Sequence, residues 1–191
     1  EWVDKGEAWA QMMMGQCYHG GQYGLKQSYV MAAMLYEKAV AQGDPVAMFD
    51  LAVLYENGYG VVQSFKKTAE LYTMAAEKGH VNAMFNLGVL YQDGEGVAQS
   101  FKKAVELFTM AAEQGNVDAM GGLGFLYIKG QGVDQSDELA REWWTKAADE
   151  GDEGAIENLK LLDEQEGKST TTAPTPTSPP PVCCSSCNTP Q

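Results

Sequence analysis

Two serine–lysine pairs have the residue types and the spacing of a nucleophile and its base. Ser64 precedes Lys67 by three positions, and Ser100 precedes Lys103 in the same way. On one helical turn, such a serine could attack a carbonyl while the lysine takes its proton. The competing interpretation is that each serine caps the helix it begins, which ties its oxygen to backbone N–H groups. Because no Ser-Asp-Asn or Lys-Thr-Gly sequence follows, the pattern favours capping, and we expect no catalytic residue and no enzyme.

A metal-binding pattern lies at the C-terminal end of the sequence. Cys184 and Cys187 form a Cys-x-x-Cys pair, which aims two thiolates at one ion and is half of a tetrahedral zinc site. The stretch resembles the opening of a MYND-type zinc finger, but the two further ligands are absent. An unstructured cysteine tail and a disulfide or lipidated end are the alternatives. We therefore expect no cofactor in this chain, and zinc only where a longer chain completes the finger.

Most of these residues belong to a repeat of about 36 residues, or follow directly after it. The copies at 43–78, 79–114 and 115–150 align without a gap, 6–42 fits with one inserted residue, 1–5 looks like the end of a preceding repeat, and 151–166 looks like a partial repeat or a capping helix. Self-similarity at this period is the signature of a stacked array of small units. Since the sequence begins within a copy, we expect it to be a piece of a longer protein.

Each copy predicts two helices joined by a glycine-rich turn. In the second copy the first helix is expected from Pro45 to Glu56, because proline suits the first turn. The turn Asn57–Gly60 ends it, and a second helix is expected from Phe65 to Glu77 with Ser64 as its N-cap. The small residue at position 52, which is glycine in later copies, is expected to let two helix backbones approach closely. The sequence therefore predicts an all-α fold.

The copies resemble Sel1-like repeats. The matching stretches are "AMFDLAVLYENGYGV", "AMFNLGVLYQDGEGV" and "AMGGLGFLYIKGQGV", each followed by a helix that ends in "AAEKG", "AAEQG" or "AADEG". The resemblance implies a right-handed α-solenoid of antiparallel helix pairs, akin to tetratricopeptide arrays, that acts as a non-catalytic scaffold or adaptor. Some such proteins have been linked to β-lactam binding, so a serine-dependent β-lactam-binding enzyme is one alternative. A structural spacer that presents a C-terminal zinc finger is another.

One stripe along the first helices stays mostly polar and is expected to face the inner groove of the superhelix. The candidate partner-binding residues are Asp50, Val53, Asn82, Asn86, Val89, Asp118 and Phe125. Acidic residues in this set predict a protein or peptide partner with Lys or Arg. In the fourth copy Gly121 and Gly122 replace two side chains, which indicates either a local recess in the groove or close helix packing.

Composition narrows the partners further. The net charge of −13 argues against binding of the repeats to a nucleic-acid backbone. No apolar run approaches the ~18 residues of a membrane span, so we expect no membrane partner. The repeats carry no ladder of cysteines, which favours a reducing compartment, cytoplasmic or nuclear. Residues 167–182, rich in Pro, Thr and Ser, predict a disordered linker before a possible zinc-finger start at 183–191.

Overall fold

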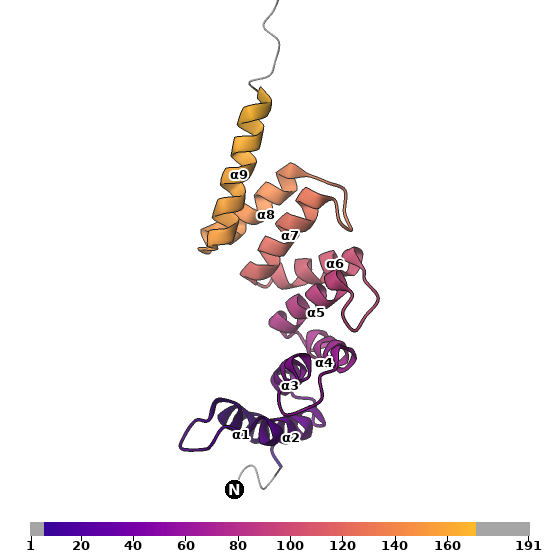
Figure 1. Cartoon of the computed structure of the whole chain (residues 1–191), viewed down its shortest axis with the longest axis vertical. Coiled ribbons are helices and arrows are strands. Elements are labelled where there is room, and N and C mark those ends of the chain that lie inside the picture. The colour runs from indigo at the N-terminus through magenta and orange to yellow at the C-terminus, as the bar shows by residue number, and fades with distance from the viewer. Residues whose placement is uncertain (1–5, 171–191) are drawn as a thin grey trace, which may run out of the picture.

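The computed structural model describes residues 6–170, and the side chains of residues 6–165. This part of the chain forms nine helices and no strand, as the repeat pattern predicted (Figure 1). The helices are α1 (Ala8–Gly20), α2 (Tyr29–Val40), α3 (Pro45–Asn57), α4 (Phe65–Glu77), α5 (Val81–Asp93), α6 (Phe101–Ala112), α7 (Val117–Lys129), α8 (Asp137–Asp149) and α9 (Glu153–Thr170).

The helices stack in chain order, and each packs mainly on its neighbours in sequence. The pairs α1–α2, α3–α4, α5–α6 and α7–α8 are the repeats, and the second helix of each pair packs on the first helix of the next. The resulting array is elongated and bends, so that α1 and α9 lie toward the same side of Figure 1. Each repeat buries its apolar residues only against adjacent repeats, which is the construction of a solenoid.

Side-chain caps fix where the helices begin. Ser64 accepts a hydrogen bond from the backbone N–H of Lys67, and Ser100 accepts one from Lys103, so the predicted serine caps are confirmed. Ser28 and Ser136 cap α2 and α8 in the same way. The first helices after α1 are capped by Asp44, His80, Asn116 and Asp152. These caps satisfy N–H groups that have no partner within the helix.

Glycines in the turns let each repeat approach the preceding one. Gly132, in the turn after α7, has a φ of 77°, which favours glycine. A Cβ built there would lie 2.5 Å from the backbone carbon of Phe101, at the start of α6. Gly96 stands at the same place in the preceding turn and is equally crowded by Phe65. In the turns after α3, α5 and α7, the second glycine is therefore required both by its backbone angle and by the packing of neighbouring repeats. In the turn after α1, Gly24 has a positive φ but no atom within 4 Å of an added Cβ.

A buried aromatic ring lies at the centre of each repeat. The rings belong to Tyr36, Tyr72, Phe108 and Trp144, one on each second helix. The small residue predicted to bring helix backbones together instead makes room for this ring. At Gly88, an added Cβ would lie 2.5 Å from the Phe108 ring, and Gly15 and Gly124 stand in the same relation to their rings. The sequence identified the small residue, but the cause of its size is the partner ring.

The array ends in an unpaired helix. α9 packs on α8 through Ala155, Leu159 and Leu162, and covers the last part of the core. It continues through residues 167–170, the first four residues of the expected linker. The rest of that linker and the cysteine pair Cys184 and Cys187 lie outside the described residues.

Candidate protein-binding site

The predicted candidate residues occupy three places on successive first helices, which we call the first-helix stripe. The three places are four and three residues apart, so they lie on one face of each helix. They hold Asn82, Asn86 and Val89 on α5, and Asp118, Gly122 and Phe125 on α7, while Asp50 and Val53 hold the last two places on α3. The structure divides them into residues that join repeats and residues that face solvent.

Asp50 is part of a joint between the first two repeats. It is half-buried, and its carboxylate accepts a hydrogen bond of 2.9 Å from Gln16 of α1. Burial raises the pKa of the Asp50 carboxyl, although this hydrogen bond acts against the shift. The phenol of Tyr36 on α2 lies close by, and burial, followed by the Asp50 carboxylate, raises its pKa. Asp50 is thus engaged within the fold and presents little free charge to a partner.

Asn86 joins the second and third repeats in a related way. Its amide donates to the Tyr72 hydroxyl at 3.0 Å, and that hydroxyl donates to Glu56 at 2.7 Å. Burial and this bond to Glu56 raise the pKa of Tyr72. In the next joint the buried ring is Phe108, which has no hydroxyl, and Gly122 takes the place of Asn86. A Cβ added at Gly122 would lie 3.1 Å from the Phe108 ring. In these two joints the polar side chain is present beside Tyr72 and absent beside Phe108.

The two adjacent glycines of α7, Gly121 and Gly122, have different surroundings. Gly122 makes room for Phe108, which is the packing alternative predicted from the sequence. Gly121 has no atom within 4 Å of its Cβ direction, which is the recess alternative, and its carbonyl accepts a 3.2 Å hydrogen bond from the indole of Trp144. The packing interpretation therefore holds for Gly122, and a recess in the groove at Gly121 stays a prediction.

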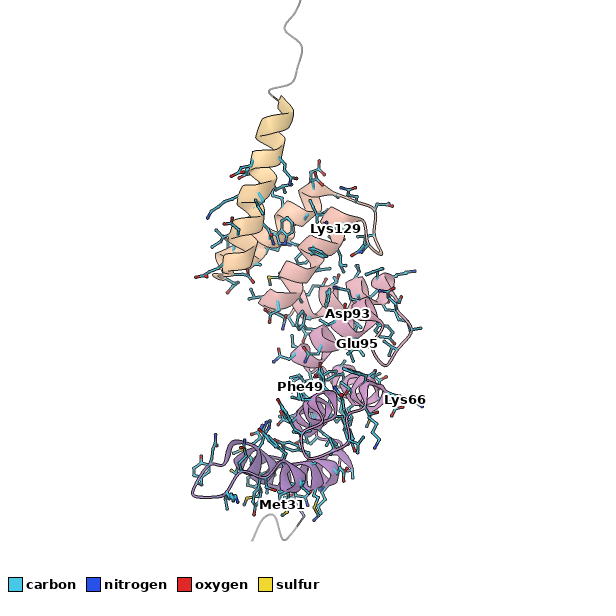
Figure 2. All side chains as sticks on the ribbon, in the orientation of Figure 1. Met31, Phe49, Lys66, Asp93, Glu95 and Lys129 are labelled. Carbon is cyan, nitrogen blue, oxygen red and sulfur yellow. The ribbon has the colours of Figure 1, made fainter. Side chains whose placement is uncertain are left out.

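The exposed part of the stripe lies on α5 and α7. Asp118 and Asn82 are exposed, although Asn82 accepts a hydrogen bond from Asn116 at 3.2 Å. Val53 and Val89 are half-buried against the core. Asp93 and Lys129, labelled in Figure 2, follow the third place by four residues, so they lie on the same face and form a fourth place of the stripe. Both are exposed, in the last turns of α5 and α7. The stripe therefore carries free negative charge at Asp93 and Asp118, and changes to positive charge at Lys129.

A pocket opens between α7 and α9, and one of its residues, Phe125, is among the candidate partner-binding residues. Its volume is ≈ 210 Å³. It is lined by Phe125, Ile128, Lys129, Trp144, Asn158, Leu161, Leu162 and Gln165. The differences between this pocket and the earlier repeats become clear when the repeats are compared position by position. In that comparison Trp144 stands at the position equivalent to Tyr72, and Ile128 at the position equivalent to Glu56.

The serine–lysine pairs do not have the geometry of nucleophile and base. Besides its cap, Ser64 is followed by a lysine whose ammonium lies 4.6 Å from the ring centre of Tyr55 and 3.2 Å from its hydroxyl. Lys103 lies in the same way over Tyr91. A cation over an aromatic face is attracted by the ring. Both members of each pair therefore have structural roles that direct them to different groups.

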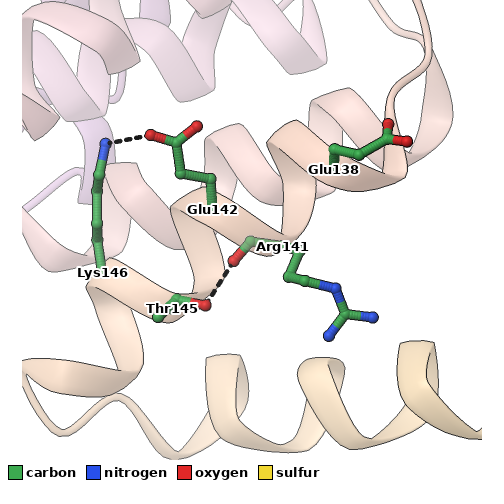
Figure 3. Close-up of a pocket in the computed structure, with 5 residues that line it drawn as sticks. All are labelled: Glu138, Arg141, Glu142, Thr145 and Lys146. Carbon is green, nitrogen blue, oxygen red and sulfur yellow. Dashed lines mark hydrogen bonds and ion pairs between the residues drawn. The ribbon is translucent and has the colours of Figure 1, made fainter.

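A shallow depression along α8 is occupied by its own charge pairs. Glu138, Arg141, Glu142, Thr145 and Lys146 line it, all on one side of the helix (Figure 3). Lys146 pairs with Glu142 at 3.3 Å, and the Thr145 hydroxyl donates to the Arg141 carbonyl at 2.8 Å. The guanidinium of Arg141 pairs with Asp163 of α9. The Arg141–Asp163 pair fastens α9 to α8, and the other two contacts lie within α8.

Within residues 6–165, no group of three or more His, Cys, Asp and Glu side chains could hold a metal ion. In the described part of the chain, no helix is both long and apolar enough to cross a bilayer. The half-site at Cys184 and Cys187 falls outside both statements.

The stacked helix pairs and the stripe along their first helices define an α-solenoid repeat protein. The chain belongs to the Sel1 repeat family, whose model matches residues 10–44, 45–80, 81–116 and 117–152. Sel1 repeat proteins are generally non-enzymatic scaffolds for protein interactions. The family frame begins the first copy four residues later, and the other three copies two residues later, than the frame drawn from the sequence.

Solved structures show the same fold. A protective antigen of uropathogenic Escherichia coli is 30% identical with a TM-score of 0.81, over 87% of this chain and 39% of that one. A Sel1 repeat protein of Oxalobacter formigenes is 26% identical with a TM-score of 0.78, over 90% of this chain and 76% of that one. The cysteine-rich protein B of Helicobacter pylori is 23% identical with a TM-score of 0.52, over 66% of this chain and 96% of that one. At this identity the similarity supports the fold alone. No curated protein sequence matches the chain.

Proposed function

We propose that the chain is a non-catalytic scaffold that binds a basic segment of a partner protein along the first-helix stripe. The observation that carries this proposal is the free negative charge of Asp93 and Asp118 on neighbouring first helices, in a chain with a net charge of −13. Opposite charge steers a basic segment toward such a surface and fixes its register. Asn82, in the first turn of α5, is exposed on the same stripe and supplies a hydrogen-bonding amide.

Asp50 contributes to the same stripe in a different manner. Because Asp50 is half-buried and bonded to Gln16, it stabilises the joint between the first two repeats and is a poor direct contact for a partner. A charge reversal at Asp50 would disturb the joint between repeats as well as any binding. The exposed carboxylates of α5 and α7 are therefore the better places to test recognition.

Selection from a displayed library of random 12-residue peptides tests the proposal. We expect the selected peptides to be rich in Lys and Arg, and to bind more weakly as salt rises. Their affinity for the variant Asp93→Lys/Asp118→Lys should fall roughly tenfold or more, because each reversal replaces an attraction with a repulsion.

The matched control reverses two exposed carboxylates on second helices. Glu70→Lys/Glu106→Lys changes the net charge by the same amount but leaves the first-helix stripe intact. If this control weakens binding as much as the stripe variant does, the effect is one of overall charge and the stripe is not the site. If the selected peptides bind both double variants with the same affinity as the wild type, the proposal is wrong.

A further inference from the structure

The α7–α9 pocket exposes apolar surface at one end of the first-helix stripe. Phe125 of α7 is 45% exposed and Leu161 of α9 is 48% exposed, and they stand at the same position of consecutive repeats. Trp144 of α8 lies below them with 5% exposure. The valines at this position in earlier copies, Val53 and Val89, pack against the core. Exposed large side chains over a buried aromatic floor are typical of a site that receives an anchor residue.

The earlier repeats show what an ordinary joint looks like at this place. Between α3 and α5 the floor is Tyr72, whose hydroxyl bonds to Glu56 and Asn86 and fills the joint with polar groups. In the pocket, Trp144 replaces the tyrosine and Ile128 replaces the glutamate. The indole N–H of Trp144 donates to the helix backbone at Gly121, so its polar atom is already satisfied. The floor thus has no unpaired polar group and suits an apolar guest.

The charge beside the pocket also differs from that of the earlier repeats. Lys129 lines the pocket at the position held by Asn57 and Asp93 in the preceding copies. Its ammonium lies 5.7 Å from the centre of the Phe125 ring, and the side chain is exposed (Figure 2). An ammonium at the edge of an apolar pocket attracts a carboxylate on the guest and forms a charge-assisted hydrogen bond with it.

We propose that the α7–α9 pocket receives an apolar side chain of the partner segment, and that Lys129 pairs with a carboxylate next to that side chain. The carboxylate is an Asp or Glu side chain or the C-terminus of the partner. This proposal rests on the proposed function, because the pocket continues the stripe that carries Asp93 and Asp118. The partner segment would then be bipolar, with basic residues along α5 and α7 and an apolar–acidic end at α9.

The peptide selection tests this pattern when it is run in two formats. One library displays peptides with a free C-terminus and the other displays them between fixed flanks, so that the two sources of the carboxylate are separated. We expect the recovered peptides to share an aliphatic or aromatic residue beside Asp or Glu, or beside the free terminus. Binding should also shift the indole ¹H–¹⁵N signal of Trp144, which Trp144→Phe identifies.

Matched variants locate the contact. Leu161→Asp should weaken binding roughly tenfold or more, whereas Leu139→Asp, on an exposed leucine of α8, should leave it unchanged. Ile128→Glu copies the residue of the second repeat, and should weaken binding even where Leu161→Asp affects folding. Lys129→Glu should change the preferred neighbour of the apolar residue from acidic to basic, while Lys102→Glu on α6 should not.

The outcomes separate the two proposals. Peptides that respond to Asp93→Lys/Asp118→Lys but ignore Leu161→Asp and Ile128→Glu overturn the pocket and leave the stripe. Peptides that ignore all of these variants overturn both. An unchanged acidic preference in Lys129→Glu overturns the role of the lysine. Melting curves of each variant, followed by circular dichroism, show whether a loss of binding comes from unfolding.

Discussion

In the third repeat, a missing methyl group leaves room for the buried ring between α5 and α6. The Cβ that an alanine would add at Gly88 falls 2.5 Å from the ring of Phe108, inside the contact distance of two carbons. Gly88→Ala should therefore destabilise the protein by about 1–3 kcal/mol through overpacking. The helix preference of alanine over glycine offsets at most ~1 kcal/mol of this cost. Urea denaturation measures the difference.

Gly121→Ala is the control for that substitution. Gly121 also lies inside a helix, but its Cβ direction is open, so the helix preference of alanine acts alone. We expect a gain of about 0.5–1 kcal/mol. Equal losses at Gly88 and Gly121 would mean that the ring does not determine the small residue.

His80 makes the array sensitive to mild acid. Its Nδ1 accepts a hydrogen bond from the backbone N–H of Ala83 and so caps α5, and its ring stacks on Phe49 at 4.6 Å. Burial lowers the pKa of His80, against the attraction of Asp50. The unfolded chain therefore takes up the proton at a higher pH than the folded one. The stabilisation of the fold by neutral His80 is therefore complete above a pH of about 6.5, and it is lost as the pH falls below that value.

His80→Asn should remove that dependence, since asparagine caps α7 in the next repeat without titrating. Between pH 7.5 and pH 5, the wild type should lose about 1 kcal/mol more stability than the variant, which is the usual value of a cap. His19→Asn, the other histidine of the chain, serves as the control and should retain the wild-type dependence. Parallel melting temperatures for wild type and His80→Asn across this range would refute the cap mechanism.

At the scale of helices, neighbouring repeats are joined by matched pairs of residues. The Tyr72 hydroxyl receives a hydrogen bond from Asn86 on α5, whereas Phe108 faces Gly122 on α7. Tyr72→Phe should cost about 1–2 kcal/mol, because it leaves Glu56 and Asn86 without their shared partner. Asn86→Ala should cost a similar amount for the same reason.

The double variant Tyr72→Phe/Asn86→Ala distinguishes pairing from separate effects. If the two residues act as one unit, the second substitution costs less than it does alone, by about 0.5–1.5 kcal/mol. A thermodynamic cycle from urea denaturation gives this coupling. Strictly additive costs would show that the hydroxyl and the amide stabilise the joint independently.

The elements were predictable because their signals are local. Pro45, Ser64 and the glycine turns set the helix boundaries to within about a residue in the repeats. The candidate site was harder, since a polar residue on a helix face has the same appearance whether it bonds to the next repeat or faces solvent. Asp50 and Asp118 could be separated only once the partners of Asp50, on α1 and α2, were placed beside it.

The same limit explains why the α7–α9 pocket was not predicted from the sequence. Trp144, Ile128 and Leu161 come from three helices, and no spacing in the sequence brings them together. The signal that could have found them is the comparison of each position with its copies, in which the floor changes from Tyr72 to Trp144. Repeats supply an internal reference, because residues needed for stacking recur, whereas residues with a further role depart from the pattern.

At the scale of the whole molecule, stability should be transmitted only between neighbours. α9 covers Trp144 and Ala147 of α8 with Ala155, Leu159 and Leu162. A chain that ends after Gly151 exposes this surface and loses roughly 3 kcal/mol of apolar burial, the value of one or two buried leucines. Because a solenoid has few contacts between distant repeats, the loss should fall on α7 and α8 and fade toward the N-terminus.

Hydrogen exchange followed by mass spectrometry resolves this difference along the chain. We expect faster exchange in α7 and α8 of the chain that ends after Gly151, and unchanged exchange in α1–α4. A chain that ends after Thr170 keeps α9 and should match the full sequence in every helix. A uniform loss of protection from α1 to α8 would instead show that the array unfolds as one cooperative unit, in which case a partner bound at α9 would stabilise the whole stripe and not only its end.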